Sequence, residues 1–220
     1  MNLCRILRQP AGSASWNMAV DEALLHEVTE PVLRFYQWSE PAVTIGYFQS
    51  WREVPEGRPF ARRYTGGGLV DHARDFTYSI VLPKGHPLDV RGTSCSYEAV
   101  HRAVADALCR EGFEVRVVSA ADPQPHAACF QRAVKYDVSD GLGKVAGAAQ
   151  RRSRSGTLHQ GSVLPPAAFS FDSFCNSFFA ELSPLLGDTA QEDIMTEAEV
   201  TRARELEVHR YATETWNRQK

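Results

Sequence analysis

The chain has 220 residues, of which 43% are hydrophobic and 23% charged, so it can bury a substantial core and has the composition of a soluble globular protein. Its 24 basic and 27 acidic residues give a formal net charge of −3, which gives no reason to expect a nucleic-acid-binding protein. No apolar run approaches the roughly 20 residues that span a bilayer, and the N-terminus lacks the charged-then-apolar plan of a signal peptide. We therefore expect a cytoplasmic protein with no membrane or nucleic-acid partner.

Hydrophobic periodicity, turn residues and capping signals predict alternating strands and helices along the chain. Ser13 or Ser15 can cap the first helix, and Thr196 with Glu199 forms a capping box that begins the last one. In chain order the predicted elements are a strand over 2–9, a helix over 17–26, strands over 32–38, 42–48, 60–64 and 76–82, a helix over 94–109, a strand over 113–118, a loop over 119–128, strands over 134–138, 144–150 and 157–164, a helix spanning 171–182, and a helix from 196.

This order predicts an α+β fold, in which a mostly antiparallel or mixed β-sheet is flanked by helices. The length favours a single domain over residues 1–220, and we expect the helices of about 169–220 to pack on the rest of it.

Two short segments in the middle of the chain suggest a ligand site. Residues 62–68 run from two arginines into three adjacent glycines, which leave backbone N–H groups open to a ligand. Residues 144–152 begin with Lys144 and continue with small side chains, so little competes for the space around the lysine amine. Together they predict a narrow slot with a cationic group at one end, which suits an acyl chain whose carbonyl is held and polarised.

Five motifs in order resemble the lipoate–protein ligase and octanoyltransferase family, which is related to biotin–protein ligases. The resemblance covers about residues 12–165 and implies a biotin/lipoate protein ligase-like catalytic domain that modifies lipoyl-domain proteins. The motifs are Asn17-Met18-Ala19-x-Asp21-Glu22-Ala23-Leu24, Arg34-Phe35-Tyr36-x-Trp38, Ile45-Gly46-Tyr47-Phe48-Gln49, Arg62-Arg63-x-Thr65-Gly66-Gly67-Gly68-x-Val70-x-His72 and Lys144-Val145-x-Gly147-x-Ala149-Gln150-x-Arg152.

The resemblance implies that Lys144 contacts the acyl carbonyl, where a fixed ammonium stabilises the oxyanion formed on attack. Arg63 either faces the site or pairs with an acidic side chain, and His72 is either a structural histidine or a ligand contact. In the family's transferases a glutamine precedes a histidine here, whereas in this chain His159 precedes Gln160. Neighbouring strand residues point to opposite faces, so the exchange moves the imidazole across the sheet, and His159 receives no catalytic role. The substrate-binding residues expected from the two motifs are Arg63, Thr65, Gly66, Gly67, Gly68, His72, Gly147 and Ala149.

Five cysteines without a C-x-x-C pair predict neither a disulfide framework nor a zinc site, and no metal site is expected. Cys129 stands in a context, Ala128-Cys129-Phe130, that resembles the catalytic cysteine of one octanoyltransferase branch. A nearby ammonium such as that of Lys144 would lower its thiol pKa. The alternative is a small buried apolar residue. The other four cysteines lie in elements with an apolar pattern and are predicted to be small buried apolar residues, namely Cys4, Cys95, Cys109 and Cys175.

Three functions remain open at this point. The first is a transferase that moves an octanoyl or lipoyl group from acyl carrier protein through a thioester on Cys129 to a lysine of a lipoyl domain of a 2-oxoacid dehydrogenase E2 or of the glycine-cleavage H protein. It requires no cofactor. The second is a lipoate–protein ligase that uses ATP and Mg, and the third is a non-catalytic acyl-binding relative. An amidotransferase between two lipoyl-type domains also uses a similar cysteine. The short segment after Pro166 mildly favours the transferase, because many ligases carry a further domain there.

Overall fold

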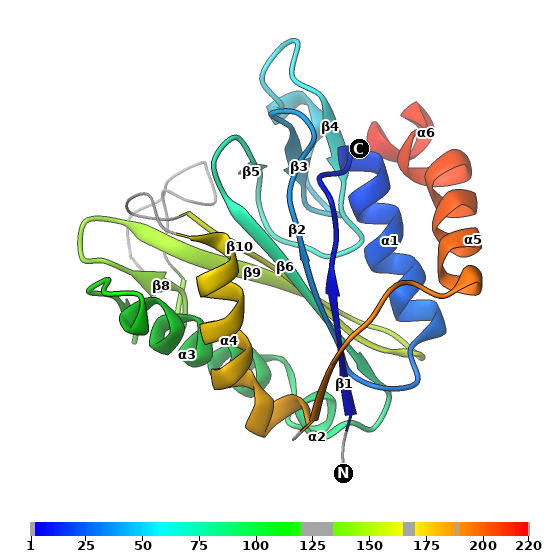
Figure 1. Ribbon diagram of the computed structural model, residues 1–220. Helices are drawn as coiled ribbons and strands as arrows, with labels where there is room; N and C mark the ends of the chain where they lie inside the picture. Colours follow the sequence, from blue (N-terminus) through cyan, green and yellow to red (C-terminus); the bar gives the residue numbers. More distant parts are fainter. Residues whose placement is uncertain (1–2, 120–133, 165–169, 188, 220) are drawn as a thin grey trace.

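The computed structural model describes residues 3–119, 134–164, 170–187 and 189–219 (Figure 1). The helices are α1 Ala14–Glu27, α2 Pro87–Val90, α3 Thr93–Arg110, α4 Phe171–Leu186, α5 Glu197–Leu206 and α6 Glu214–Asn217, with a 3-10 turn η1 at Trp51–Glu53 and a π-helical turn η2 at Glu207–Tyr211. The strands are β1 Leu3–Arg8, β2 Val32–Tyr36, β3 Val43–Ile45, β4 Phe60–Arg62, β5 Val70–Asp71, β6 Phe76–Pro83, β7 Arg116–Val117, β8 Val138–Ser139, β9 Lys144–Arg152, β10 Gly156–Val163 and β11 Thr189–Glu192.

A mixed sheet of eight strands, in the order β11-β1-β2-β6-β10-β9-β8-β7, forms the centre of the molecule. Strand β1 runs parallel to both of its neighbours, whereas β2, β6, β10 and β9 alternate in direction. The predicted α+β class with a mixed, mostly antiparallel sheet flanked by helices is confirmed.

Helices cover both faces of this sheet (Figure 1). On one face α3 and α4 pack on residues such as Leu33, Phe35 and Ile80, and on the other α1 packs on Val32 and Val81, with α5 outside it. Helix α1 begins at the predicted cap, since the Ser13 hydroxyl accepts the N–H of Trp16. Because neighbouring residues of a strand face opposite sides, the two faces carry separate apolar clusters.

A second sheet of three strands, β4-β3-β5, carries the glycine segment and lies beside the end of the large sheet. Within this part, the end of β3 touches the glycine segment at Gly46, where a Cβ would lie 1.9 Å from the carbonyl oxygen of Gly67. Only glycine fits there, because the β3 end and the glycine segment are in backbone contact. The sequence predicted one sheet, and the separation of these three strands was not foreseen.

Several predicted strands are shorter than expected, and the largest differences are in two of them. The prediction of 113–118 reduces to β7 at Arg116–Val117, and that of 134–138 gives way to a turn before β8. Tyr136 has a φ of 75°, in the left-handed region that an extended strand does not use. The carboxylate of Asp137 also accepts the N–H of Val134 at 2.7 Å, which closes the turn. Strand β11, parallel to β1, was not predicted either.

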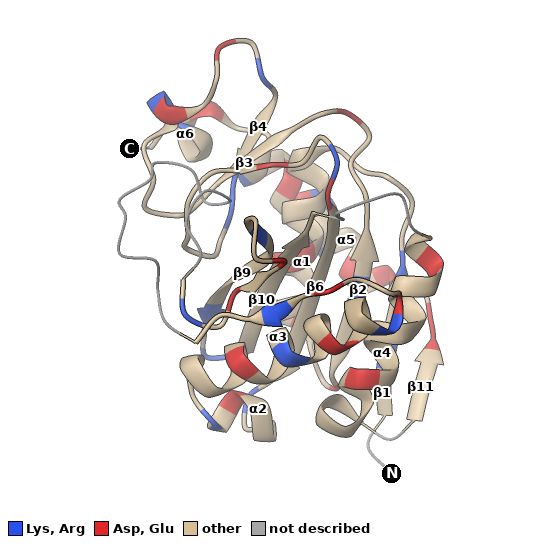
Figure 2. Cartoon of the chain, turned by 90° about the vertical axis from the view of Figure 1, so that its left-hand side faces the viewer, with Lys and Arg blue, Asp and Glu red and all other residues tan. Residues whose placement is uncertain are grey.

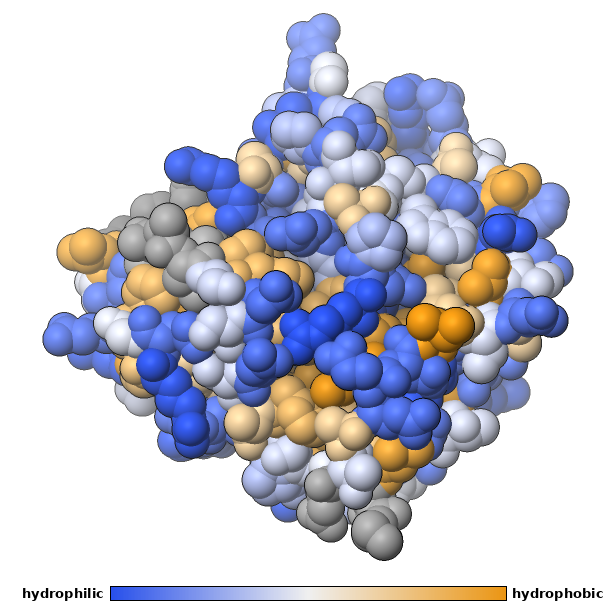
Figure 3. Space-filling view, viewed as in Figure 1, coloured by the Kyte–Doolittle hydropathy of each residue, from blue (hydrophilic) through white to orange (hydrophobic). Residues whose placement is uncertain are grey.

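Within the described part of the chain, no helix is long and apolar enough to cross a membrane. On the face seen in Figure 3, hydrophilic side chains predominate and apolar ones lie between them.

Candidate active site

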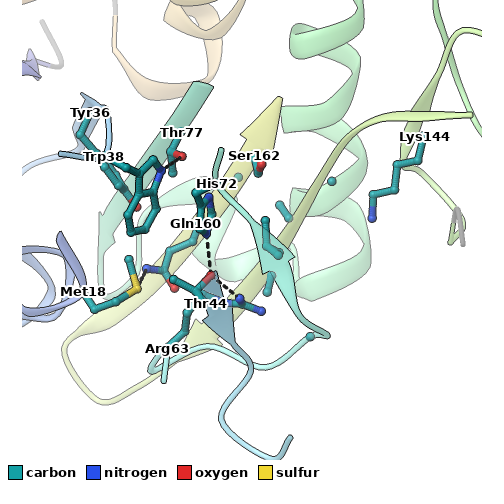
Figure 4. Close-up of a pocket in the computed structure, with 16 residues that line it drawn as sticks. Met18, Tyr36, Trp38, Thr44, Arg63, His72, Thr77, Lys144, Gln160 and Ser162 are labelled. Atoms are coloured by element: carbon teal, nitrogen blue, oxygen red, sulfur yellow. Dashed lines mark hydrogen bonds between the residues drawn. The ribbon is translucent and has the colours of Figure 1, made fainter. Parts of the chain in front are cut away.

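A hollow of about 470 Å³, its open mouth included, lies between the large sheet, α1 and the three-stranded sheet (Figure 4). Strands β9 and β10 supply one wall, the glycine segment supplies another, and α1 and β2 close the far side. Six of the predicted site residues line it, namely Arg63, Gly67, His72, Lys144, Gly147 and Ala149. The two motifs, 80 residues apart in sequence, are therefore brought to one cavity, as the sequence predicted.

Lys144 lies at one end of this hollow with its side chain almost fully buried. Its ammonium is 2.9 Å from Oδ2 of Asp137, a carboxylate that is itself completely buried. The lysine chain crosses directly over Gly147, since a Cβ on that glycine would lie 2.1 Å from Lys144 Cε and 2.2 Å from Nζ. The glycine thus creates the space that the ammonium occupies, which explains why the motif places a glycine three residues after the lysine.

A hydrogen-bonded scaffold fixes Asp137 and so fixes the lysine. The Tyr97 hydroxyl of α3 donates to Asp137 Oδ1 at 2.6 Å and accepts a hydrogen bond from the N–H of Ala148, in the middle of β9, at 3.1 Å. Burial and the neighbouring Asp137 raise the pKa of Tyr97 far above its usual value, so the phenol keeps the proton that it donates. Helix α3, strand β9 and the turn at Tyr136 therefore hold the ammonium jointly.

A second polar chain joins the glycine segment to the large sheet. Arg63 donates to the Thr44 hydroxyl at 2.6 Å and to the carbonyls of Gly66 and Gly68 at 3.1 and 2.7 Å. Arg63 thus faces the site, which is one of the two predicted alternatives, and it also holds the glycine segment in place.

His72 continues that chain. Its Nε2 lies 2.7 Å from the Thr44 hydroxyl and its Nδ1 2.7 Å from Oδ2 of Asp75, and its ring stacks on Trp38 at a centroid distance of 3.8 Å. The arrangement assigns the Nδ1 proton to the carboxylate bond and leaves Nε2 to accept from Thr44. His72 is both structurally satisfied and part of the cavity wall.

The far side of the hollow rests on a buried polar network. Gln160 accepts from the Thr65 hydroxyl at 2.6 Å and donates to Asp21 at 2.6 Å, so Thr65 acts behind the wall. Asp21 in turn pairs with Arg34 at 2.7 Å, and neither side chain of this pair has any exposed surface. A buried pair of this kind resists displacement, because separating it would leave an uncompensated charge in the interior.

The predicted nucleophile, Cys129, lies outside the described residues. Of the other cysteines, Cys4 and Cys175 are buried, and burial raises the pKa of each thiol to about 12. This agrees with the prediction that they are inert. Cys95 and Cys109 are exposed, contrary to the prediction that they are buried apolar residues.

His159 lies on the α3 side of the sheet, away from the hollow. It stacks near Tyr78, and Gln150 Nε2 lies 2.9 Å from its Nδ1. Burial lowers the pKa of His159 well below its usual value, and the same cause lowers that of His101 beside it to about 4. Both rings are neutral core residues, and the predicted transfer of this imidazole to the other face of the sheet is confirmed.

Arg151 and Arg152, at the end of the lysine motif, have separate structural roles. Arg152 donates to the Asp89 carbonyl, to Thr93 and to Ser96, which fastens β9 to α2 and α3. Arg151 lies over the ring of Tyr64 at 4.4 Å. Basic and acidic residues are interspersed along the helices in Figure 2.

Sequence reasoning missed the residues contributed by distant elements. Met18 of α1, Tyr36 of β2, Trp38, Thr44 of β3 and Gln160 of β10 all line the hollow. Met18, Tyr36 and Trp38 stand in the motifs that carry the family resemblance, but only tertiary packing shows which of their side chains reach the cavity.

Comparison with known proteins identifies the family of this chain. Residues 13–179 match the family described as the lipoyl protein ligase A/B catalytic domain. The octanoyltransferase LipM of Moorella thermoacetica is 36% identical over 175 residues, which are 73% of this chain and 64% of that protein. The chain thus spans less than two thirds of that relative's length.

Two solved structures share the whole fold. A lipoate-protein ligase A bound with ATP has a TM-score of 0.82 and 27% identity, covering 99% of this chain and 98% of its own. A bi-partite lipoate protein ligase from Thermoplasma acidophilum, described together with its E2 lipoyl domain, has a TM-score of 0.73 and 25% identity, covering 98% of this chain and 95% of its own. The resemblance seen in the sequence is confirmed, and the chain belongs to the lipoyl protein ligase A/B catalytic domain family.

Proposed function

We propose that this protein is a cytoplasmic acyltransferase of lipoate assembly, which moves an octanoyl group from acyl carrier protein to a lysine of a lipoyl domain or of the glycine-cleavage H protein. The observation that carries the proposal is the ammonium of Lys144, fixed at one end of a slot where β9 contributes the small residues Gly147, Ala148 and Ala149. The likeness to an octanoyltransferase supports the choice of octanoyl as the group transferred.

The chemistry proposed needs two exchanges at one carbonyl. The thiolate of Cys129 attacks the thioester carbonyl of the donor, and the carrier's thiolate leaves as the new thioester forms. The acceptor lysine amine then attacks the same carbonyl, forms the amide, and gives its proton to the departing Cys129 thiolate. Thioester exchange between two thiols is nearly isoenergetic, so the first step needs no ATP.

Lys144 supports both steps in the same way. Each attack places negative charge on the carbonyl oxygen, and an ammonium already oriented by Asp137 stabilises that charge without reorganising. Backbone N–H groups of the glycine segment, braced by Arg63, are the second set of donors in this proposal. The slot itself holds the acyl chain and keeps water from the thioester.

The test is intact-protein mass spectrometry after mixing the protein with octanoyl-carrier in the absence of ATP. We expect an octanoyl adduct on the wild type and on Cys95→Ser, a matched variant at an exposed cysteine, but none on Cys129→Ala. An adduct that persists in Cys129→Ala would refute the assignment of the nucleophile.

An ATP-dependent lipoate–protein ligase is the second candidate, because one structural relative is a ligase bound with ATP. It predicts pyrophosphate release from ATP and lipoate, with Cys129 dispensable. Both oxygens of Asp137, the buried carboxylate beside Lys144, are already engaged by Tyr97, Val134 and the lysine. This carboxylate therefore fits its role as a lysine partner better than that of a Mg ligand.

A further inference from the structure

The acyl slot has two ends, and the end opposite Lys144 sets how long a chain it can accept. In Figure 4 Lys144 lies at one side of the hollow, and Met18 lies at the other with Trp38 and Tyr36 near it. A carbonyl at the Lys144 end therefore directs the tail of the acyl chain toward Met18.

Most side chains at this end are locked in place. The Trp38 indole N–H donates to the Thr77 hydroxyl at 2.8 Å, and its ring stacks on His72. The Tyr36 hydroxyl donates to Asp21 at 3.0 Å. Moving either ring would break a hydrogen bond that is buried at Tyr36 and partly buried at Trp38, so these residues form a rigid wall.

Gln160 is equally fixed. Its amide oxygen accepts from Thr65, its amide nitrogen donates to Asp21, and Asp21 also accepts from Arg34 and from the Ser79 hydroxyl at 2.7 Å. The slot cannot deepen in this direction without disrupting a network of buried charges.

Met18 differs from its neighbours in how it is held. Among the described residues, Met18 accepts a weak hydrogen bond from Gln160 Nε2 to its thioether sulfur, at 3.3 Å. A methionine side chain is unbranched, has three rotatable bonds and adapts its shape to whatever packs against it. It is 2% exposed, so its packing and not solvent fills the end of the slot.

We infer that Met18 is the residue that determines acyl-chain length, closing the slot against the terminal methyl of an unbranched, medium-length saturated chain. The inference rests on the proposed function and specifies its substrate. The end group must be apolar, because it meets a thioether and an indole ring, and shortening Met18 is the change that lengthens the slot while the rigid wall stays intact.

The experiment measures the dissociation constants of free hexanoate, octanoate and decanoate by calorimetry, since a carboxylate can pair with Lys144 as the acyl carbonyl would. Each methylene that gains a buried position strengthens binding about fourfold. We expect Met18→Ala to raise the affinity for decanoate relative to octanoate about tenfold. Met18→Phe, which fills the end, should weaken octanoate about tenfold and leave hexanoate unchanged. Met195→Ala, at a partly buried methionine outside the slot, is the matched control and should keep the wild-type profile.

An unchanged chain-length profile in both Met18 variants, with octanoate still bound, would overturn the inference alone. The Met18→Phe variant keeps the test valid if Met18→Ala does not fold. Binding that depends on Met18 in a protein that forms no octanoyl adduct would leave the inference standing and refute the proposed transfer. If the wild type binds none of the three acids, the inference fails, and the adduct experiment alone decides the proposed transfer.

Discussion

The substitution Gly147→Ala tests whether the position of the Lys144 ammonium controls transfer, because it should displace the ammonium while the protein stays folded. The new Cβ would lie 2.1 Å from Lys144 Cε and 2.2 Å from Nζ, well inside van der Waals contact. Both clashing atoms are at the end of a flexible side chain, so the lysine moves and the backbone stays. The ammonium then leaves both Asp137 and the site of the developing oxyanion.

The magnitude follows from the loss of one preorganised donor, which lowers turnover by about 10²–10³-fold. Asp137 keeps its bonds from Tyr97 and Val134 but loses a buried ionic partner, which destabilises the fold by about 3–5 kcal/mol. We therefore expect a folded protein with nearly full secondary structure and almost no transfer.

The assay is single-turnover formation of the octanoyl adduct, with urea unfolding of the same samples. Gly143→Ala is the matched control in the same hairpin, because a Cβ there meets no atom within 4 Å. Transfer within tenfold of the wild type in Gly147→Ala would refute the argument that the lysine acts from its position over this glycine.

Three further changes test the surrounding scaffold. Tyr97→Phe removes the hydroxyl that donates to Asp137 at 2.6 Å, and we expect turnover to fall about tenfold, the cost of about 1.4 kcal/mol of positioning, with the octanoate affinity unchanged. Arg34→Leu leaves the carboxylate of Asp21 buried without its ionic partner, so urea unfolding should show a loss of about 3–5 kcal/mol; a loss below about 1 kcal/mol would contradict the network. Burial lowers the pKa of His101 to about 4, so this ring is neutral in the folded protein, whereas the unfolded chain takes up a proton below about pH 6.5. As the pH falls from about 6.5 to about 4, the free energy of unfolding should therefore fall by up to about 1.4 kcal/mol per pH unit. His101→Phe should make this pH dependence less steep.

The glycine and lysine motifs were readable from the sequence because each is a local pattern with a backbone or side-chain reason. Gly46 is required by a close backbone approach that no other residue allows, and Gly147 leaves the space that the end of the Lys144 side chain occupies. The caps at Ser13 and Thr196 were also predictable, since a cap depends on its own first turn. The strand predicted over 134–138 was wrong, because Asp137 closes a turn there in which Tyr136 has a left-handed φ.

The sequence by itself thus determined the class of fold, the family, and the two segments that meet at the site, since these depend on periodicity and on motifs of adjacent residues. Only the tertiary structure decided what holds Lys144 and what closes the slot. The partners concerned, Asp137 with Tyr97 and Gln160 with Met18, are 40 and 142 residues apart. Contacts over such separations are set by how helices pack on the sheet, and no local pattern encodes them.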